Sequence, residues 1–550
     1  MKNDVKLTFE DGSSLMVRNG SEISDIIKTL NISEDIIAVN INGHICESNT
    51  RIKEDSKIKF VDIMSKPGRM IYRSGLKFVY IVAIKELFGN NTLVKIEHSL
   101  DKGMYTELEL NMPITQDIVN KIKDKMKEIV NRDININKIT ALRTDVIEYY
   151  KSIKEDEKVM SYTQMTNEFV TMYELLNYYN YFYSIMPSST GILKYFDLTL
   201  IDEKGILLQY PDNDKKIPKY ISRDKILGVF KDYNEKIKAL NVSYVSDLNK
   251  IISDGKIAEF IQLNEIIQNE KLLDITDEIL KRKKDLKIVL IGGPSCSGKT
   301  TSSRKLALYL KSKNISSMTI STDDYFKERK DSPKDEKGNY NFECLDAIDI
   351  ALFNSDLKKL INYEEIKMPT FNFITGKKEY KKPPVKLEKN MIIIIEGLHT
   401  LNENLTKSID RKNKFKIYAS PFTPLSLDRH NHISTVDMRL LRRIVRDNAH
   451  RGYNAEATLK NWVSVRNGEE KYVFPFQNDA DIVYNTASIY EIGVLKTYAE
   501  PLLYSINSDS EVYEEATRLI NFLKCFFAVA ENYIPNTSIL REFVGFSYFE

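Results

Sequence analysis

The sequence predicts a multidomain chain with α+β units in its N-terminal half and an α/β unit with a parallel sheet in its C-terminal half. The length of 550 residues exceeds that of one ordinary domain and suggests about three. Short strands and tight-turn signals over residues 1–64 indicate a small α+β unit. From residue 285 onward, apolar β-rich runs alternate with helical periodicity, which is typical of a parallel sheet covered on both faces.

Composition argues against several classes of protein. Basic and acidic residues nearly balance, 80 against 78, so charge alone does not indicate a nucleic-acid partner. The four cysteines share no metal-ligand spacing, which argues against a zinc site or a disulfide framework and fits a reducing compartment. The N-terminus lacks an apolar signal segment, and the longest apolar runs are far below the ~20 residues of a membrane span. We therefore expect a cytoplasmic protein with no membrane partner, and the sequence leaves a homo-oligomer open.

The first unit, residues 1–64, is predicted to be a ubiquitin-like β-grasp domain. The strands KLTF and SLMV flank Asp11-Gly12, which is a strong hairpin signal. Ser21 precedes an amphipathic stretch over residues 22–30, which predicts a helix capped by this serine. Two further strands, IIAVNI and KIKFVD, follow, with a second turn at Asn42-Gly43 between them. This order resembles the TGS domain at the front of threonyl-tRNA synthetases and some GTPases.

The second unit, residues 68–215, begins with helical periodicity over 71–88 and later contains the turn and strand SSTGILKYFDLTLID. This order resembles the editing domain that follows TGS in threonyl-tRNA synthetases. The resemblance implies a His-x-x-x-His pair and a Cys-x-x-x-His pair, and the matching positions here are Arg73, Lys77, Phe182 and Met186. These side chains cannot replace imidazole and thiolate as ligands or as general bases. The sequence therefore predicts an editing-like α+β domain without its metal-binding and catalytic residues.

Residues 216–284 are predicted to form a helical linker that packs against the following unit. Apolar residues recur at helical spacing over 226–240 and 251–283. Helices are also predicted over 490–524, so residues 491–550 are predicted to be a helical extension that docks on the unit before it.

The unit at residues 285–490 opens with a phosphate-binding loop. Residues 293–300 match G-x-x-x-x-G-K-[ST], follow the apolar strand 287–291 and precede a predicted helix over 301–313. The glycines let backbone N–H groups approach phosphates, and the helix N-terminus favours their charge. The alternative is a glycine-rich turn without a nucleotide. The loop predicts an ATP and Mg²⁺ site, with ATP bound by Gly293, Pro294, Ser295, Cys296, Ser297, Gly298, Lys299, Thr300 and Thr301.

Three acidic residues follow predicted strands of this unit. Asp323 and Asp324 come after strand 317–321, where a carboxylate can accept a hydroxyl proton beside a metal ion; the alternative is a turn or a helix cap. Glu396 comes directly after strand 391–395, the usual position of a metal ligand in such folds. Together with Thr300, the residues Glu396 and Asp323 are the predicted Mg²⁺ ligands.

An arginine-rich helix is predicted between the two remaining strands, at 415–419 and 480–484. Arg439, Arg442, Arg443 and Arg446 share one helical face, and Arg451 comes after it. Such a face suits transferring phosphates; the alternative is a solvated face paired with acids. The density of arginine favours a cationic lid.

These elements, in this order, resemble the uridine kinase and phosphoribulokinase family. Asn341–Asp349 resembles the substrate segment of that family, Met368–Phe373 resembles another, and IIIIEGLH and RLLRRIVRD match its metal-binding strand and lid. The resemblance implies an ATP-dependent phosphotransferase with an alcohol acceptor, a nucleoside in the first instance. It implies a base at Asp323 and phosphate contacts by Lys299, Arg443, Arg446 and Arg451. A bacterial group of nucleoside kinases has the same order of TGS, editing-like and kinase domains.

The acceptor side departs from the family. Phe371 and Gly376 stand where a tyrosine and a histidine flank the pyrimidine in uridine kinases, Glu343 stands for an aspartate, and Tyr453 stands for a lid arginine. A site without those hydrogen-bonding groups cannot discriminate by them. The predicted acceptor contacts are Glu343, Phe342, Phe371 and Arg443.

Two other functions stay open. One is a kinase for another small alcohol. The other is an ATP-gated RNA- or ribosome-binding protein, which the synthetase-like domains suggest, although no basic stripe marks them. The front domains also fit a role in regulation or dimerisation alone. His430-x-His432 fits either a metal pair or two ordinary histidines.

Overall fold

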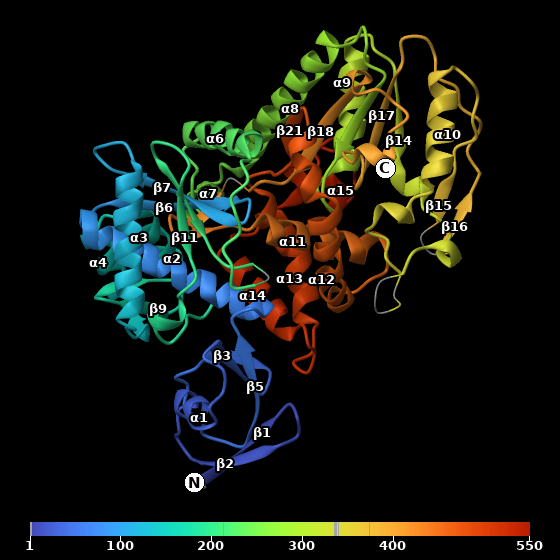
Figure 1. Cartoon of the computed structure of the whole chain (residues 1–550). Helices are drawn as coiled ribbons and strands as arrows, with labels where there is room; N and C mark the ends of the chain where they lie inside the picture. Colours follow the sequence, from blue (N-terminus) through green and yellow to red (C-terminus); the bar gives the residue numbers. More distant parts are fainter. Residues whose placement is uncertain are drawn as a thin grey trace.

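The computed structural model describes residues 3–549, apart from 213, 335–337, 339, 373–374 and 424. Figure 1 shows a small N-terminal unit at one end, a second α+β unit beside it, and a larger α/β unit that contains the C-terminus. Helices α6 and α8 run from the second unit across to the α/β unit. This arrangement confirms the predicted multidomain α+β and α/β fold. In the described part of the chain, no helix has both the length and the apolar character needed to span a membrane.

The N-terminal unit is a five-stranded β-grasp sheet with the strand order β2-β1-β5-β3-β4, in which β1 and β5 run parallel. Its hairpins turn at Gly12 and at Asn42-Gly43, all with positive φ, as the sequence predicts. The elements are β1 (Asp4–Phe9), β2 (Ser14–Arg18), α1 (Ile23–Thr29), β3 (Ile36–Ile41), β4 (His44–Glu47) and β5 (Ser56–Asp62).

The predicted cap of α1 is wrong. Glu22 holds the N-cap position, without a side-chain hydrogen bond to the helix. The Ser21 hydroxyl instead donates to the carbonyl of Arg18 at 2.7 Å, and the N–H of Ile23 bonds to the carbonyl of Thr50. A backbone carbonyl elsewhere in the same chain thus accepts from an N–H group at the start of the helix, where the serine side chain was expected to do so.

The second unit packs the long helix α2 (Lys66–Phe88) and α3 (Gln116–Asn131) on an antiparallel sheet ordered β11-β12-β7-β6. Gly75 lets α2 approach the segment at residue 187, since a Cβ there would lie 2.7 Å from Pro187 Cγ. The strands of this sheet are β6 (Leu93–Leu100), β7 (Gly103–Glu109), β11 (Asp197–Leu200) and β12 (Gly205–Gln209). A second sheet with two short helices contains β8 (Asn137–Leu142), α4 (Arg143–Ser152), α5 (Asp156–Thr163), β9 (Phe169–Leu175) and β10 (Tyr178–Asn180).

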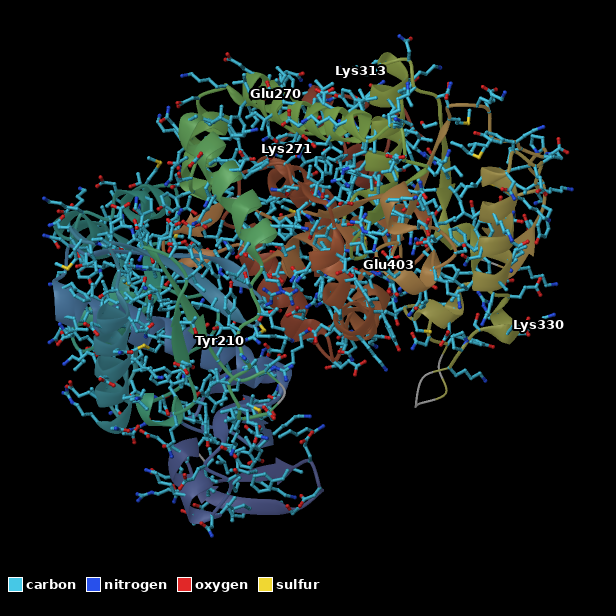
Figure 2. The ribbon with its side chains drawn as sticks, turned by 45° about the horizontal axis from the view of Figure 1, so that its top comes forward. Tyr210, Glu270, Lys271, Lys313, Lys330 and Glu403 are labelled. Carbon is cyan, nitrogen blue, oxygen red and sulfur yellow. The ribbon has the colours of Figure 1, made fainter. Side chains whose placement is uncertain are left out.

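The linker region forms α6 (Asp224–Ala239), α7 (Val245–Ser253) and α8 (Ile257–Lys281). The predicted helix over 251–283 is interrupted, because Gly255 takes a positive φ and ends α7. Lys271 of α8 pairs with Asp232 of α6 at 2.9 Å, and Figure 2 labels this lysine. Ile261, Ile275 and Ile279 of α8 belong to the same apolar core as Val289 and Ile291 of the α/β unit.

The α/β unit contains a five-stranded, fully parallel sheet with the order β14-β17-β13-β18-β21. Side chains of β13 alternate between two cores: Val289 and Ile291 pack toward α8 and α9, and Ile288 and Leu290 toward α10. Glu403, labelled in Figure 2, pairs with Lys414 and Lys416 at the start of β18. The strands are β13 (Ile288–Gly292), β14 (Ser317–Ser321), β17 (Ile392–Gly397), β18 (Lys414–Ser420) and β21 (Ile482–Asn485).

Helices and hairpins surround this sheet. The helices are α9 (Lys299–Ser312), α10 (Ile350–Ile361), α11 (Thr435–His450), α12 (Ala455–Tyr472), α13 (Glu491–Tyr504), α14 (Tyr513–Leu523) and α15 (Arg541–Val544). The hairpins pair β15 (Thr370–Asn372) with β16 (Lys377–Glu379), and β19 (Ser426–Asp428) with β20 (Asn431–His432).

The hairpin of β19 and β20 joins the α/β unit to the second unit. Its Arg429 donates two hydrogen bonds to Glu157 of α5, at 2.6 and 2.7 Å. Lys158 donates to His430 Nδ1 at 2.7 Å. Desolvation lowers the pKa of the partly buried Lys77 to about 8, and the nearby charge of Asp428 opposes this shift. The hairpin therefore lies close to Lys77.

The two histidines of the His-x-His sequence lie in this interface. His430 is buried and His432 is partly buried, and loss of contact with water lowers the pKa of His432 to about 3. Among the described residues, no cluster of three or more His, Cys, Asp or Glu side chains has an arrangement suited to a metal ion. The structure favours packed histidines here over the metal pair.

We predict that Glu157→Gln destabilises the chain by about 3 kcal/mol, because it leaves the Arg429 guanidinium without its buried carboxylate. The two side chains are 6% and 13% exposed, so solvent cannot replace the lost partner. Chemical unfolding measures the loss. The control is Glu148→Gln, which removes a 72% exposed partner of Lys151 and should cost under about 0.5 kcal/mol. Equal losses in the two variants would contradict the prediction.

Candidate functional site

The loop at residues 293–298 connects β13 to α9 at the carboxyl edge of the parallel sheet. Gly298 takes the N-cap position with φ +75°, and a Cβ on Gly293 would lie 2.0 Å from the carbonyl oxygen of Ala419. Both positions therefore require glycine. The loop places the first-turn N–H groups of α9 at this edge. Such groups bind anions because they have no hydrogen-bond acceptor within the helix.

Lys299 and Thr300 begin α9. Lys299 Nζ donates to the carbonyl of Pro294 at 2.9 Å, so the lysine folds over its own loop. Thr300 Oγ1 donates to Glu396 Oε1 at 3.3 Å. Glu396 is the last but one residue of β17 and pairs in register with Ile291 of β13 and Ser321 of β14, which places it between the ends of two neighbouring strands.

Asp323 and Asp324 have different surroundings. Asp324 Oδ1 accepts from the N–H of Phe371 at 3.4 Å, and its Oδ2 lies 3.5 Å from Lys382 Nζ, so this carboxylate faces β15. The cap of the short turn after β14 is the Ser321 hydroxyl, which accepts from the N–H of Asp323 at 3.4 Å. The Asp323 side chain therefore does not serve as that cap, and its charge acts on Glu396 instead.

The pKa of Glu396 is raised to about 7. Burial is the largest cause, the charge of Asp323 adds to it, and Lys299 opposes it. Thr300, Glu396 and Asp323 thus bring oxygen atoms to one place. Oxygen ligands of this kind suit Mg²⁺, so the residues fit the predicted metal.

The arginines of α11 divide into two groups. Arg439 forms a double ion pair with Glu469, and Arg442 forms one with Glu491; all four side chains are at most 1% exposed. Arg439 also donates to the carbonyl of Ser295 at 3.3 Å, and Arg442 to that of Cys296 at 3.2 Å. The expectation that all four arginines form one phosphate-facing surface is wrong for these two, because buried carboxylates already neutralise them.

The other arginines surround Asp447. Arg443, Arg446 and Arg451 lie 3.2, 2.7 and 3.8 Å from its carboxylate. Arg443 also donates to the hydroxyl of Ser295 at 3.0 Å, so it reaches the loop. Asp447 thus groups three guanidinium groups, and one of them contacts the loop.

The residues predicted for the acceptor fall into two groups. Phe326 contacts both Phe342 and Phe371, with ring centroids 6.2 and 5.7 Å apart. The pKa of Glu343 is raised to about 7, mainly by burial; Arg443 opposes this rise, and Asp323 adds to it. The structure thus groups these aromatic rings near one end of the site and Glu343 near Arg443.

Two further positions depart from the pattern of the family, Gly376 and Tyr453. Gly376 has φ +69° and accepts a backbone hydrogen bond from Arg329, and Tyr453 is 51% exposed beyond α11. Phe373, the last residue of the predicted segment at 368–373, lies outside the described residues.

The sequence did not single out three residues at this site. Glu469 accepts from the loop N–H of Ser295 at 2.9 Å, and Glu542 accepts from Thr301. His399 is 2% exposed beside Glu343, and burial lowers its pKa to about 4, so its ring is neutral. His399 stands in IIIIEGLH and could have been suspected from that position. Glu469 and Glu542 have no local signal, because they meet the loop only through the fold.

Known proteins resemble separate parts of the chain. Residues 288–492 match the model of the Phosphoribulokinase / Uridine kinase family. The N-terminal regions are similar to threonine–tRNA ligases: those of Clostridium tetani and of Geobacter sp. are each 26% identical, over 37% and 38% of this chain and 34% of each ligase. The chain thus spans about a third of the length of these curated relatives.

Two solved structures overlap the chain in part. One, described as a possible uridine kinase from Bacillus stearothermophilus, is 20% identical, with a TM-score of 0.28, over 39% of this chain and 98% of that one. The other, D-glycerate 3-kinase from Cryptococcus neoformans, is 14% identical, with a TM-score of 0.26, over 38% and 90%.

The family match includes the loop, Asp323, Glu343, Glu396 and the arginines of α11. It supports a small-molecule kinase, that is, a phosphotransferase. The match ends at residue 492, so α14, α15 and the chain up to residue 287 lie outside it.

We predict that Glu343→Gln stabilises the chain at pH 8 and changes little at pH 5. The pKa of Glu343 in the folded chain, about 7, exceeds its ordinary value of 4.5. The folded chain therefore binds the proton more tightly, and the free energy of unfolding decreases as the pH rises between these values. Glutamine removes this penalty. Chemical unfolding at both pH values measures it, with Glu388→Gln, at an exposed position, as the control; an equal shift at pH 5 and pH 8 would count against the assignment.

Proposed function

We propose that the chain is an ATP-dependent kinase that transfers the γ-phosphate to a hydroxyl group of a small acceptor, with a nucleoside as the first candidate. One observation carries the proposal. Asp323 and Glu396 meet at adjacent carboxyl ends of a parallel sheet, directly beside Lys299 and Thr300 of a phosphate-binding loop. Ligands of open α/β sheets bind at this edge.

On this proposal, the loop and the first turn of α9 bind the triphosphate, and Lys299 exchanges the Pro294 carbonyl for the β- and γ-phosphates. Thr300, Glu396 and Asp323 would hold Mg²⁺, which neutralises phosphate charge when it is bound. The Asp323 carboxylate accepts the proton of the acceptor hydroxyl. Arg443, Arg446 and Arg451 neutralise the oxygens of the transferred group.

The acceptor would lie between Asp323 and the aromatic group of Phe326, Phe342 and Phe371. Glu343 and the neutral His399 could bind its other hydroxyl groups. Aromatic rings stack on any base or flat ring without reading its edge. Acceptors other than uridine, including another small alcohol, are therefore within the proposal, and phosphate transfer from labelled ATP across nucleosides, sugars and other alcohols would identify the acceptor.

A second candidate is an RNA-binding role for the N-terminal regions, which their similarity to threonine–tRNA ligases favours. The hairpin at 426–432 lies close to Lys77 and contacts the residue before Phe182, since Asn431 donates to the carbonyl of Tyr181 at 3.0 Å. We propose that these regions are a scaffold without editing chemistry. Binding of tRNA that weakens steeply with salt, together with no acceptor-dependent use of ATP, would favour the RNA-binding role instead.

We predict that Asp323→Asn lowers the rate of transfer to the identified acceptor by at least about 100-fold, because the proton acceptor is lost, while ATP still binds. Initial rates and calorimetric titration with ATP measure the two effects. Asp324→Asn is the matched control: it removes the adjacent carboxylate, which faces Phe371 and Lys382, and the amide oxygen of asparagine can still accept from the N–H of Phe371. Near-normal turnover of Asp323→Asn would remove this residue from the base role.

A further inference from the structure

The C-terminal segment of the chain folds back onto the phosphate-binding loop (Figure 1). Glu542 Oε2 accepts from the N–H of Thr301 at 3.1 Å and from its hydroxyl at 2.7 Å. Thr301 is the third residue of α9, so its N–H is one of the groups that the helix does not satisfy. In a loop of this type, these N–H groups bind phosphate oxygens.

The segment also covers the space around this contact. The side chain of Ile539 packs against Gly298, where a Cβ would lie 2.6 Å from Ile539 Cγ2. The guanidinium of Arg442 lies 4.8 Å from the ring centroid of Phe543. Glu542 is thus one part of a packed lid over the start of α9, and not an isolated surface contact.

Specific contacts hold the segment in this position. Arg541 donates to the carbonyls of Glu531 and Ile534, at 2.9 and 3.0 Å. Ser538 donates to Glu265 of α8 at 2.7 Å, and Tyr490 donates to the same carboxylate oxygen at 2.7 Å. The segment is therefore tied both to the linker helix and to the chain that follows β21.

We propose that Glu542 is an internal competitor of the nucleotide: its carboxylate occupies a phosphate-binding position at the start of α9, so that a triphosphate binds only after α15 shifts. The identity of the ligand rests on the proposed function. The carboxylate and a phosphate oxygen need the same two donors of Thr301, and two negative charges cannot share them without repulsion. The competitor lies outside the family match, which ends at residue 492.

A purely structural role is the competing explanation. A carboxylate at a helix N-terminus also stabilises the helix through its dipole. The two explanations predict different changes in the affinity for ATP. Removing a competitor strengthens ATP binding, whereas removing a helix cap weakens the fold and leaves the affinity unchanged or lower.

The test compares the full chain with Glu542→Gln by calorimetric titration with ATP and Mg²⁺. Glutamine keeps the size of the side chain and removes its charge, and we expect ATP to bind about tenfold more tightly. Glu511→Gln is the control, because it removes a 74% exposed carboxylate from the same C-terminal extension; we expect its affinity to match that of the unaltered chain.

Two results would overturn the proposal. The first is unchanged or weaker ATP binding by Glu542→Gln while the unaltered chain binds ATP, which leaves the proposed function intact. The second is no ATP binding by any of the three proteins, which removes the proposed function as well. Hydrogen exchange of the unaltered chain decides the matter if the variant does not fold: we expect ATP to speed exchange of the amides at 538–545, and equal exchange with saturating ATP would reject the competitor.

Discussion

Two buried ion pairs, between Arg439 and Glu469 and between Arg442 and Glu491, hold the phosphate-binding loop against α11. Their guanidinium groups also donate to the loop carbonyls of Ser295 and Cys296. Buried charges of this kind are tolerated only when each has its partner and its remaining hydrogen bonds. With these pairs formed, α11 fixes the backbone of the loop, and its other arginines pair with Asp447 instead.

The same helix links the site to the front of the chain. The hairpin of β19 and β20 leads into α11 through Ser434, whose side chain caps that helix. Arg429 and His430 of the hairpin bind α5 of the second unit. A displacement of the second unit would therefore act on the start of the arginine helix through packed and hydrogen-bonded contacts, not through a flexible tether. Glu265 of α8 bonds to the C-terminal segment that carries Glu542.

Much of the fold and part of the site could be predicted because their signals are local. The turn residues Asp11-Gly12 and Asn42-Gly43 specify their hairpins, and apolar runs specify the strands of the parallel sheet to within two residues. Glu396 lies near the end of β17 and Asp323 two residues after β14, and parallel strands bring their carboxyl ends to one edge. Helix ends were less predictable: Ser21 and Gly255 show that neighbouring backbone and a single positive φ decide them.

The sequence by itself determined the loop at 293–300, the strands that flank it and the two acidic residues at strand ends, because each depends on residues adjacent in the chain. Only the tertiary structure decided which arginines of α11 are neutralised, since Glu469 and Glu491 reach them from other helices. It also decided that Asp324 faces β15, while the Asp323 charge acts on Glu396. The contact of Glu542 with Thr301 spans 241 residues. Such contacts leave no periodicity or motif in the sequence, because they depend on where separate elements pack and not on how any one of them forms.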